Sequence, residues 1–429
     1  MGNGGLLQIS AFGSQNVWLN VNPHITFWKS VYRRHTQFAL ESIENTFNGS
    51  ADFAKKVNCL ISRNGDMIYH IWLRVALSAL TASSGNVNWA RYLGHVLINS
   101  VEFQIGGSKI DKHYGDWLTI WNELTQVAEK QDAYNMLIGN VSGMYTPASS
   151  IAARVVYVPL QFTFNRNAGA ALPLIALRNH DVRLEFDFRT ASDCFSGTAT
   201  TPTFTNCTLW VEYVYLDEDE RRKYAREGHE YLIEQLQFTG EETKAASTAA
   251  QNFTLSFNHP VKFLAWVAPN TANETAKEWA NYTDAVGFAG GHTLGTGQSS
   301  KFLINGNDRF PPREDLYFGL IQPYEYMPRV PATGIYCYSF ALYPTQLQPS
   351  GAINLSRIEK AILQLVFTGT AAGKCRIYAF GYNVLRIQGG MGALAYASWR
   401  RWDGKTVLRK RLGWVIRRCY LLFIYELKS

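Results

Sequence analysis

The chain has 429 residues, enough for two or three domains. It is 17% charged and 14% aromatic, with 34 glycines and 23 tyrosines, which is typical of a folded, aromatic-rich β-protein and excludes a disordered chain. The formal net charge of +7 comes from the C-terminus, because residues 399–429 hold nine bases and two acids and leave 32 of each for residues 1–398. This balance does not support a general basic face, so we expect no specific nucleic-acid partner.

The N-terminal residues have neither the basic region nor the apolar region of a secretory signal, and no run of about 18 apolar residues predicts a membrane-spanning helix. The cysteines are scattered, without a CxxC pair or a zinc spacing. We therefore predict free thiols rather than disulfides at the six positions Cys59, Cys194, Cys207, Cys337, Cys375 and Cys419.

The first half predicts strands separated by turns. Pro23 marks a turn, and the aromatic and β-branched residues over 22–47 favour a strand. The cluster Arg33-Arg34-His35 within it is interpreted as a basic strand end that makes ion pairs, with a phosphate contact as the alternative. Residues 56–62 and 67–77 are predicted to pair as a hairpin around Asn64-Gly65-Asp66, because Asn-Gly is a strong hairpin signal.

One convincing helix is predicted in this half, over residues 116–130, where Trp117, Ile120, Trp121 and Leu124 share a face. We expect that face to pack against the edge of a sheet. Further strands are predicted at 101–105, 155–164 and 182–189. The last is the clearest, because Val182, Leu184, Phe186 and Phe188 alternate with charged residues.

The stretch 208–238 predicts a joint at the middle of the chain. An alternating strand ends near Leu216, four acids follow at 217–220, and three bases occupy 221–223. This order suits a helix dipole and places opposite charges at i,i+4 spacing, with Gly228 as a C-terminal stop. We interpret residues 217–228 as a connecting helix between two β-domains; the alternative is a surface helix inside one domain.

The second half repeats the same pattern of short strands, predicted at 253–257, 261–267, 336–342, 361–367 and 376–387, with a long loop over 268–297. Two strand-rich halves of similar length suggest a duplicated β-sandwich or barrel.

The motifs that carry chemistry are missing. The nine histidines form no HxH or HExxH pair, no GxSxG occurs, and residues 291–301 resemble a phosphate loop without its GK[ST]. We therefore predict no enzyme, no catalytic, cofactor-binding or metal-binding residues, and no cofactor. Asn-x-Ser/Thr sequons, most of them interpreted as coincidental, occur at Asn48, Asn140, Asn206, Asn252, Asn273, Asn281 and Asn354.

Several long blocks resemble one known family. They are ITFWKSVYRRHTQFALE (25–41), IDKHYGDWLTIWNELT (110–125), PLQFTFNRNAGAALPLIAL (159–177), YLDEDERRKYAREGHEYLIEQLQ (215–237), LINGNDRFPPREDLYF (303–318) and RIYAFGYNVLRIQGGMGALAYAS (376–398). In this order they resemble the major capsid proteins of the nucleocytoplasmic large DNA viruses, the algal-virus, iridovirus and mimivirus group.

The resemblance implies an all-β double jelly roll, that is, two eight-stranded antiparallel β-sandwiches with short connecting helices. It implies a homotrimer of pseudo-hexameric outline that tiles an icosahedral virion shell around an inner membrane, with assembly in the host cytoplasm. The implied partners are the chain itself, neighbouring capsomers and minor capsid proteins. The alternative is a carbohydrate-binding β-sandwich, or a capsid protein that also binds host glycans, since Tyr and Trp stack on sugars.

On this basis we expect five segments: an N-terminal arm (1–24) along the underside of the trimer, a first jelly roll (25–216), the joint (217–228), a second jelly roll (229–398) and a basic, aromatic tail (399–429). The loop over 268–300 would form the outer tower.

The tail has two interpretations. Its bases, with Trp399, Trp402 and Trp414 and an apolar run at 419–425, suit an anionic surface such as the inner viral membrane. Alternatively it is an accidental extension beyond Ser398, near which chains of the family generally stop, because termini tolerate additions.

We predict that the tail is dispensable for folding and for trimer formation. A chain truncated after Ser398 should give the same trimer yield and melting temperature as the full chain, and loss of the trimer or a large drop in melting temperature would contradict this prediction.

Overall fold

The computed structural model describes residues 4–28, 33–288, 290–294, 300–369 and 371–396. The chain divides into two units, residues 1–38 and 39–429. The first unit carries two short helices, α1 (Gly4–Ser10) and α2 (Ser14–Asn20), neither of which buries a residue. The strand predicted over 22–47 begins only at Phe38, as β1, which pairs with β12.

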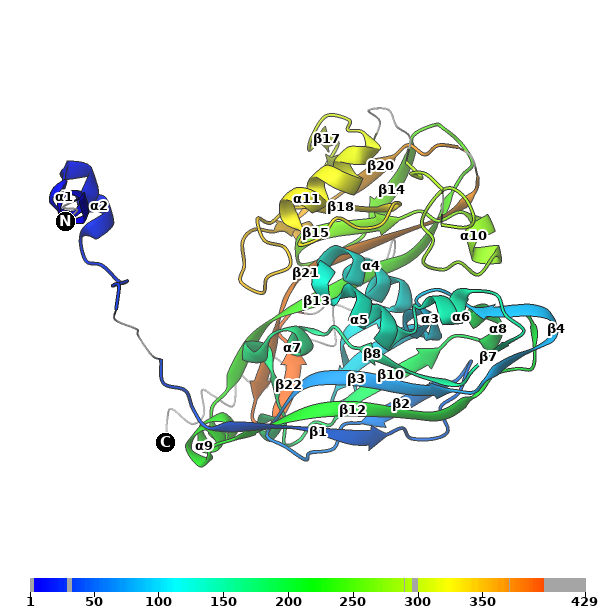
Figure 1. Cartoon of the computed structure of the whole chain (residues 1–429), viewed down its shortest axis with the longest axis horizontal. Coiled ribbons are helices and arrows are strands. Elements are labelled where there is room, and N and C mark those ends of the chain that lie inside the picture. Colours follow the sequence, from blue (N-terminus) through cyan, green and yellow to red (C-terminus); the bar gives the residue numbers. More distant parts are fainter. Residues whose placement is uncertain (1–3, 29–32, 289, 295–299, 370, 397–429) are drawn as a thin grey trace, which may run out of the picture. The chain divides into compact units, whose positions relative to one another are not determined.

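Residues 38–216 form three sheets (Figure 1). The first has the order β1-β12-β3-β8, with β9 also on β3; the second is β2-β10-β5-β6 and the third β11-β4-β7. Their bounds are β1 (Phe38–Thr46), β2 (Lys56–Leu60), β3 (Met67–Leu77), β4 (Leu80–Trp89), β5 (Ile98–Ile105), β6 (Ser108–Tyr114), β7 (Ser150–Ile151), β8 (Arg154–Pro159), β9 (Leu172–Pro173), β10 (Val182–Phe188), β11 (Phe195–Ala199) and β12 (Phe204–Leu216). One buried cluster takes side chains from both larger sheets, such as Leu73 and Leu209 from the first and Val101 and Leu184 from the second, so they form a sandwich.

Residues 229–394 form a second sandwich from two sheets, β13-β21-β15-β18 with β19 and β22 attached, and β14-β20-β16-β17. The bounds are β13 (His229–Lys244), β14 (Gln251–Leu255), β15 (Pro260–Val267), β16 (Lys301–Ile304), β17 (Asn307–Asp308), β18 (Ile335–Ser339), β19 (Ile353–Asn354), β20 (Ala361–Leu365), β21 (Gly373–Gln388) and β22 (Met391–Leu394). Its own buried cluster includes Phe253, Trp266, Phe302 and Leu363.

The remaining helices are short connections. They are α3 (Leu93–Leu97), α4 (Gly115–Thr125), α5 (Ala128–Ile138), α6 (Ser142–Tyr145), α7 (Thr163–Arg166), η1 (Ala168–Ala170), η2 (Leu174–Ala176), α8 (Ala191–Cys194), α9 (Glu218–Arg226), α10 (Thr271–Thr275), η3 (Tyr317–Ile321), α11 (Gln322–Tyr326) and η4 (Leu355–Arg357). Within the described ranges, no helix is long and apolar enough to cross a membrane. The five cysteines that are described are free, as predicted; Cys419 lies outside the described residues.

The alternation predicted over 182–189 is confirmed, since Val182, Leu184, Phe186 and Phe188 are buried along β10. The predicted hairpin around Asn64-Gly65-Asp66 is wrong. β2 pairs with β10, whereas β3 pairs with β12, so this segment crosses from one sheet to the other. A Cβ at Gly65 would lie 2.8 Å from the Cβ of Tyr213, so the glycine serves close packing on β12 rather than a hairpin turn.

Two of the sequon asparagines, Asn273 and Asn281, are fully buried. The amide nitrogen of Asn273 donates to the carbonyls of Asn281 and Thr283, and that of Asn281 donates to the carboxylate of Glu278. These two side chains are enclosed in the fold and are not accessible to a glycan in the folded chain.

The helix predicted at 217–228 is α9, and it connects β12 to β13. Of the predicted i,i+4 pairs, Glu218 binds Arg222, whereas Arg221 turns instead to the buried Asp66, 2.7 Å from its carboxylate. The second oxygen of Asp66 accepts the backbone N–H of Leu216 at 3.0 Å. The helix ends at Arg226 with Glu227 as its C-cap, so Gly228 is the residue after the cap, as predicted, although Glu227 is extended (φ −78°, ψ 151°) and Gly228 is not left-handed.

We predict that α9 is docked and resists proteolysis in the native chain, and that Asp66→Ala loosens it. Loss of hydrogen bonds to a charged group should cost about 1.5–3 kcal/mol of unfolding free energy. Limited trypsin digestion should leave the wild type intact at Arg221–Arg226 and cut the variant there. Ready cleavage of the wild type into two intact halves would contradict this prediction.

Candidate functional site: the seam between the two sandwiches

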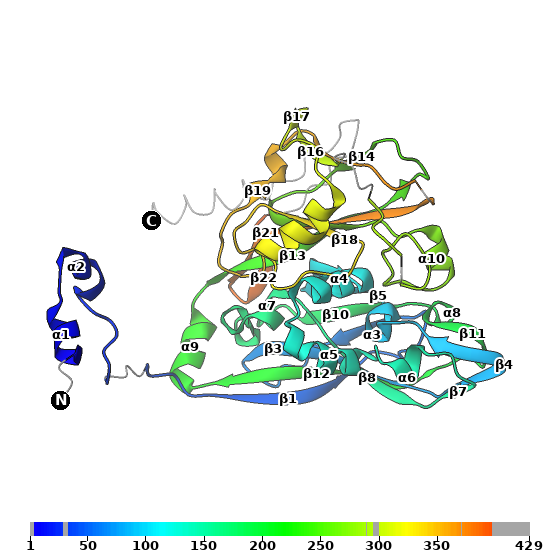
Figure 2. The same cartoon turned by 45° about the horizontal axis from the view of Figure 1, so that its top comes forward.

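A cluster of ion pairs and aromatic rings lies where the two sandwiches meet, and we call this contact the seam. Helix α4 occupies its centre, between the sheets of the first sandwich and strands β13 and β21 of the second (Figures 1 and 2). The predicted apolar face of α4 is confirmed, but its expected packing against a sheet edge is wrong. Trp117, Ile120, Trp121 and Leu124 share one buried cluster with residues of the second sandwich.

Aromatic rings form the apolar part of the seam. The ring of Trp117 lies 5.6 Å from that of Phe380 and 5.5 Å from that of Tyr378, and the ring of Trp121 lies 5.1 Å from that of Phe380 (centroid distances). Each such pair contributes about 0.5–1.5 kcal/mol beyond the burial of its area. The rings therefore form an apolar cluster that is shared by the two sandwiches.

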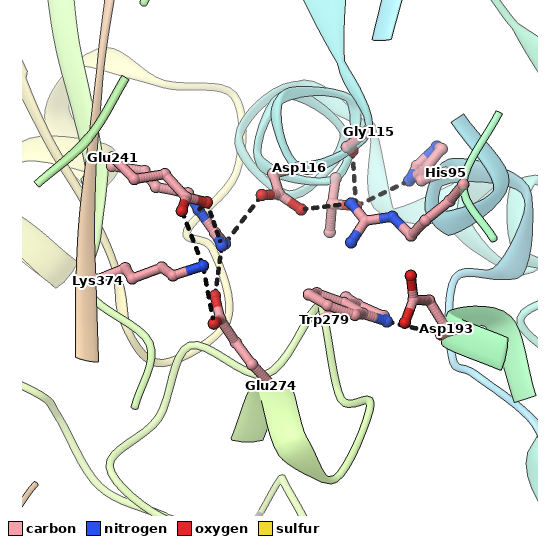
Figure 3. Close-up of polar contacts among 11 residues, drawn as sticks. His95, Gly115, Asp116, Asp193, Glu241, Glu274, Trp279 and Lys374 are labelled. Carbon is pink, nitrogen blue, oxygen red and sulfur yellow. Dashed lines mark hydrogen bonds and ion pairs between the residues drawn. The ribbon is translucent and has the colours of Figure 1, made fainter. Parts of the chain in front are cut away.

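An ionic network extends from the start of α4 to the second sandwich (Figure 3). Asp116, in the first turn of α4, lies 2.9 Å from Nη1 of Arg376 on β21. Nη2 of Arg376 lies 2.7 Å from Glu241 and also contacts Glu274, and Lys374 lies 2.8 Å and 3.3 Å from the same two carboxylates. The side chain of Arg376 is only 4% exposed, so its charge is satisfied by protein groups rather than by water.

The electrostatics of this network favour the charged forms of Arg376, Glu241 and Lys374. Burial by itself would lower the pKa of Arg376, but the charges of Asp116 and its neighbours raise it. Burial raises the pKa of Glu241, yet the hydrogen bond from Lys374 and the charge of Arg376 outweigh it, so the net shift is downward. The hydrogen bond to Glu241 raises the pKa of Lys374. These three shifts move the pKa of each group farther from neutral pH.

The loop after α10 adds a second set of contacts across the seam. The guanidinium of Arg189 stacks 4.2 Å from the ring centroid of Trp279, whose Nε1 donates to the carbonyl of Asp193 at 2.8 Å. Nζ of Lys277 donates to the carbonyl of Phe195 at 2.9 Å. The tryptophan thus anchors a loop of the second sandwich on the first.

A second buried ion cluster lies farther along the seam, around Glu234 of β13. Its carboxylate contacts Nζ of Lys262 and lies 2.7 Å from Nη2 of Arg166 on α7. The guanidinium of Arg166 also stacks 4.6 Å from the ring centroid of Trp121. Burial lowers the pKa of Lys262 although Glu234 opposes the shift. As in the first network, the charges hold two elements together.

A buried histidine supports α4 from the side of the first sandwich. Nε2 of His95 lies 2.7 Å from the hydroxyl of Tyr134, and Nδ1 lies 3.1 Å from the hydroxyl of Thr119 on α4. Burial lowers the pKa of His95 to about 3. The imidazole is therefore neutral at physiological pH.

From the sequence we predicted no site residue, so every residue of the seam was missed as a site residue. Only the apolar face of α4 and the acid at its start carried a sequence signal. The loop at 291–301 lies partly outside the described residues. Among the described residues, no three His, Cys, Asp or Glu side chains form a group that could hold a metal ion.

Both halves of the chain match known protein families. Residues 26–217 match the family described as major capsid protein N-terminus, and residues 220–393 match large eukaryotic DNA virus major capsid protein. The chain is 44% identical to the major capsid protein of Pyramimonas orientalis virus and 40% identical to that of Paramecium bursaria Chlorella virus 1, each over 92% of this chain and 100% of the relative.

Solved structures agree with the expected architecture. The quasi-atomic model of the PBCV-1 virus capsid matches with a TM-score of 0.74 and 38% identity, over 87% of this chain and 100% of that chain. The Faustovirus major capsid protein matches with the same TM-score of 0.74 at 14% identity, over 90% and 96% of the two chains, and supports the fold alone. The predicted double jelly roll is confirmed.

We predict that Arg376→Met lowers the free energy of unfolding by about 1.5–3 kcal/mol, because the half-buried carboxylates of Asp116 and Glu274 lose their contacts with a charged guanidinium. Arg386→Met, on the same strand, is the matched control: its ion pair with Glu230 is more than half exposed, so the loss should stay below about 1 kcal/mol. Denaturant unfolding measures both values, and equal losses would contradict a special role for the seam.

We also predict that stability falls as the pH is lowered from neutral. The folded state keeps His95 neutral down to a pKa of about 3, whereas the unfolded side chain binds a proton near its usual value of 6.5. Between these values the unfolded state binds more protons, so the unfolding free energy should fall by up to about 1.4 kcal/mol per pH unit. The lowered pKa of Glu241 adds a loss below the usual 4.5.

The variant His95→Gln should remove most of the pH dependence between about 6 and 5, which denaturant titrations at each pH measure. An unchanged slope in this variant would show that other groups set the acid sensitivity.

Proposed function

This chain belongs to the large eukaryotic DNA virus major capsid protein family, and we propose that it builds the shell of a virion as a homotrimer of pseudo-hexameric outline. It is a structural protein of a non-enzymatic family. Its relatives are capsid components of virions. These relatives give no support to the carbohydrate-binding alternative.

The single observation that carries the proposal is the seam. Three chains can present six similar lateral sides only if each chain contributes two similar sandwiches at a constant angle. The ion pairs of the buried Arg376 and the buried rings around Trp117 join the two sandwiches. A hinged pair of domains would instead show a more polar contact of the kind that permits movement.

Exposed apolar side chains support contact between copies. One group lies on η3 and the residue before it, on α11 and just beyond β18, and its side chains are at least 43% exposed. It consists of Leu316, Leu320, Ile321, Tyr324, Leu342 and Tyr343. A soluble monomer rarely leaves such large groups uncovered together, so we assign this surface to contacts within the trimer or between capsomers.

The proposed division of the chain is the arm at 1–24, jelly rolls at 25–216 and 229–398, and the joint at 217–228. The separation of the β1–β12 sheets from the β13–β22 sheets supports it, as does the position of α9 between β12 and β13. The tail at 399–429 lies outside the described residues. Minor capsid proteins, the inner viral membrane and assembly in the host cytoplasm remain proposals that rest on the family relationship.

We predict that the purified full chain sediments at micromolar concentration as a trimer of three 48.4 kDa subunits and appears pseudo-hexameric by negative-stain microscopy. Replacing exposed apolar groups with charges, as in Leu320→Glu with Tyr324→Glu, should weaken assembly without a comparable loss of subunit stability. Arg386→Met, an exposed change elsewhere, is the control. A wild-type chain that sediments only as a monomer would contradict the proposed function.

A further inference from the structure

A lysine and an asparagine meet at one end of the second sandwich. Lys244 is the last residue of β13 and pairs with Gly373, the first residue of β21. On the other side of β21, Asn270 forms a bridge with the same Gly373. Strand β21 lies between β13 and β15, so Gly373 separates Lys244 from Asn270 in the sheet. The two side chains meet by passing over this glycine.

Gly373 allows this approach because it has no side chain. A Cβ at this position would lie 2.1 Å from the carbonyl oxygen of Pro269, a distance that no real Cβ shows. The glycine therefore brings the three strand ends together more closely than any other residue would permit.

The lysine and asparagine side chains are in direct contact. Nζ of Lys244 donates to Oδ1 of Asn270 and, at 3.3 Å, to the carbonyl oxygen of Ala268. Nδ2 of Asn270 donates to the backbone carbonyl of Asp284 at 2.6 Å, which fixes the orientation of the amide. Lys244 is 0% exposed and Asn270 is 1% exposed, so water does not compete for these groups.

The environment of the amine is unusual for a lysine. Among the described residues, Lys244 forms no ion pair with a carboxylate, whereas the other fully buried lysine, Lys262, contacts Glu234. Its Nζ lies 5.3 Å from the ring centroid of Phe367. Burial lowers the pKa of Lys244 to about 8, against smaller opposing effects of Cys375 and Asp284. At pH 7 about a tenth of the amine is then neutral and nucleophilic.

We propose that Lys244 and Asn270 join in an intramolecular isopeptide bond. The neutral amine nitrogen attacks Cγ of Asn270, a bond forms between Nζ and Cγ, and the bond between Cγ and Nδ2 breaks. Nδ2 takes a proton given up by Nζ and leaves as ammonia, so no oxidant or further reactant is needed. The reaction of an amine with an amide is slow in water because the two groups rarely meet in the right geometry. Here the folded chain holds Nζ of Lys244 against the amide of Asn270 in a buried site.

The crosslink would have two physical consequences. It replaces a buried amine, which is costly when charged, with a neutral amide. It also closes a loop between positions separated by 26 residues and bridges β13 and the end of β15 across β21. As for a disulfide, restricting the unfolded chain should stabilise the folded one. The inference concerns the subunit and does not depend on the proposed trimer.

The test is the intact mass of the denatured full chain. Loss of one ammonia lowers the mass by about 17 Da relative to the sequence, and tryptic digestion should yield one branched peptide that contains both Lys244 and Asn270. Lys244→Arg keeps a cation that cannot attack and should restore the full mass, as should Asn270→Ala. Lys262→Arg is the matched control and should keep the deficit.

The outcomes are distinguishable. A cyclic imide at Asn270 would give the same mass deficit. In that case the deficit would persist in Lys244→Arg and the wild type would give no branched peptide. Either of these two observations would overturn the proposal. A wild-type chain at its full sequence mass would also overturn it. If the variants fail to fold, the peptide map of the wild type decides alone, because a branched peptide is either present or missing.

Discussion

The contact between Asp116 and Arg376 is the interaction on which the arrangement of the two sandwiches depends. A guanidinium that is 4% exposed cannot rely on water, so it must be surrounded by acceptors, and these come from α4, β13 and α10. A buried ion pair adds little net stability compared with apolar packing, because both charges lose their hydration. It does, however, penalise every arrangement that leaves a charge unpaired. The network thus selects one relative orientation of the sandwiches.

The apolar rings supply the affinity that the ions do not. Trp117 and Trp121 belong to a helix of the first sandwich, yet they pack on Phe263, Tyr378 and Phe380 of the second. Burial of these rings drives the contact, while the ions at Asp116 and Glu234 set its geometry. A subunit built this way transmits force between its halves as one body, which is what a closed shell requires of each of its members.

The polar groups of the seam are used for holding rather than for chemistry. In each network acids pair with bases, and the pKa shifts keep Glu241 ionised and His95 neutral. This arrangement suits a structural protein that must remain folded.

The sequence by itself determined what depends on near neighbours along the chain. Alternation over 182–189 identified β10, since side chains two residues apart share a face of a strand. The order of acids and bases identified α9, and the apolar face of α4 followed from its helical spacing. The long blocks of family resemblance added the double jelly roll, which no local pattern contained.

Only the tertiary structure decided which of these elements meet. Asn64-Gly65 predicted a hairpin because local turn chemistry favours one, but the pairing of β3 with β12 placed the two strands in different sheets. For Arg221 we predicted an ion pair with the acid four residues before it, but its guanidinium binds Asp66, which is 155 positions away. Arg376 and Glu241 lie 135 positions apart. Contacts at such separations depend on how sheets stack and chains cross, so no spacing within a local window can encode them.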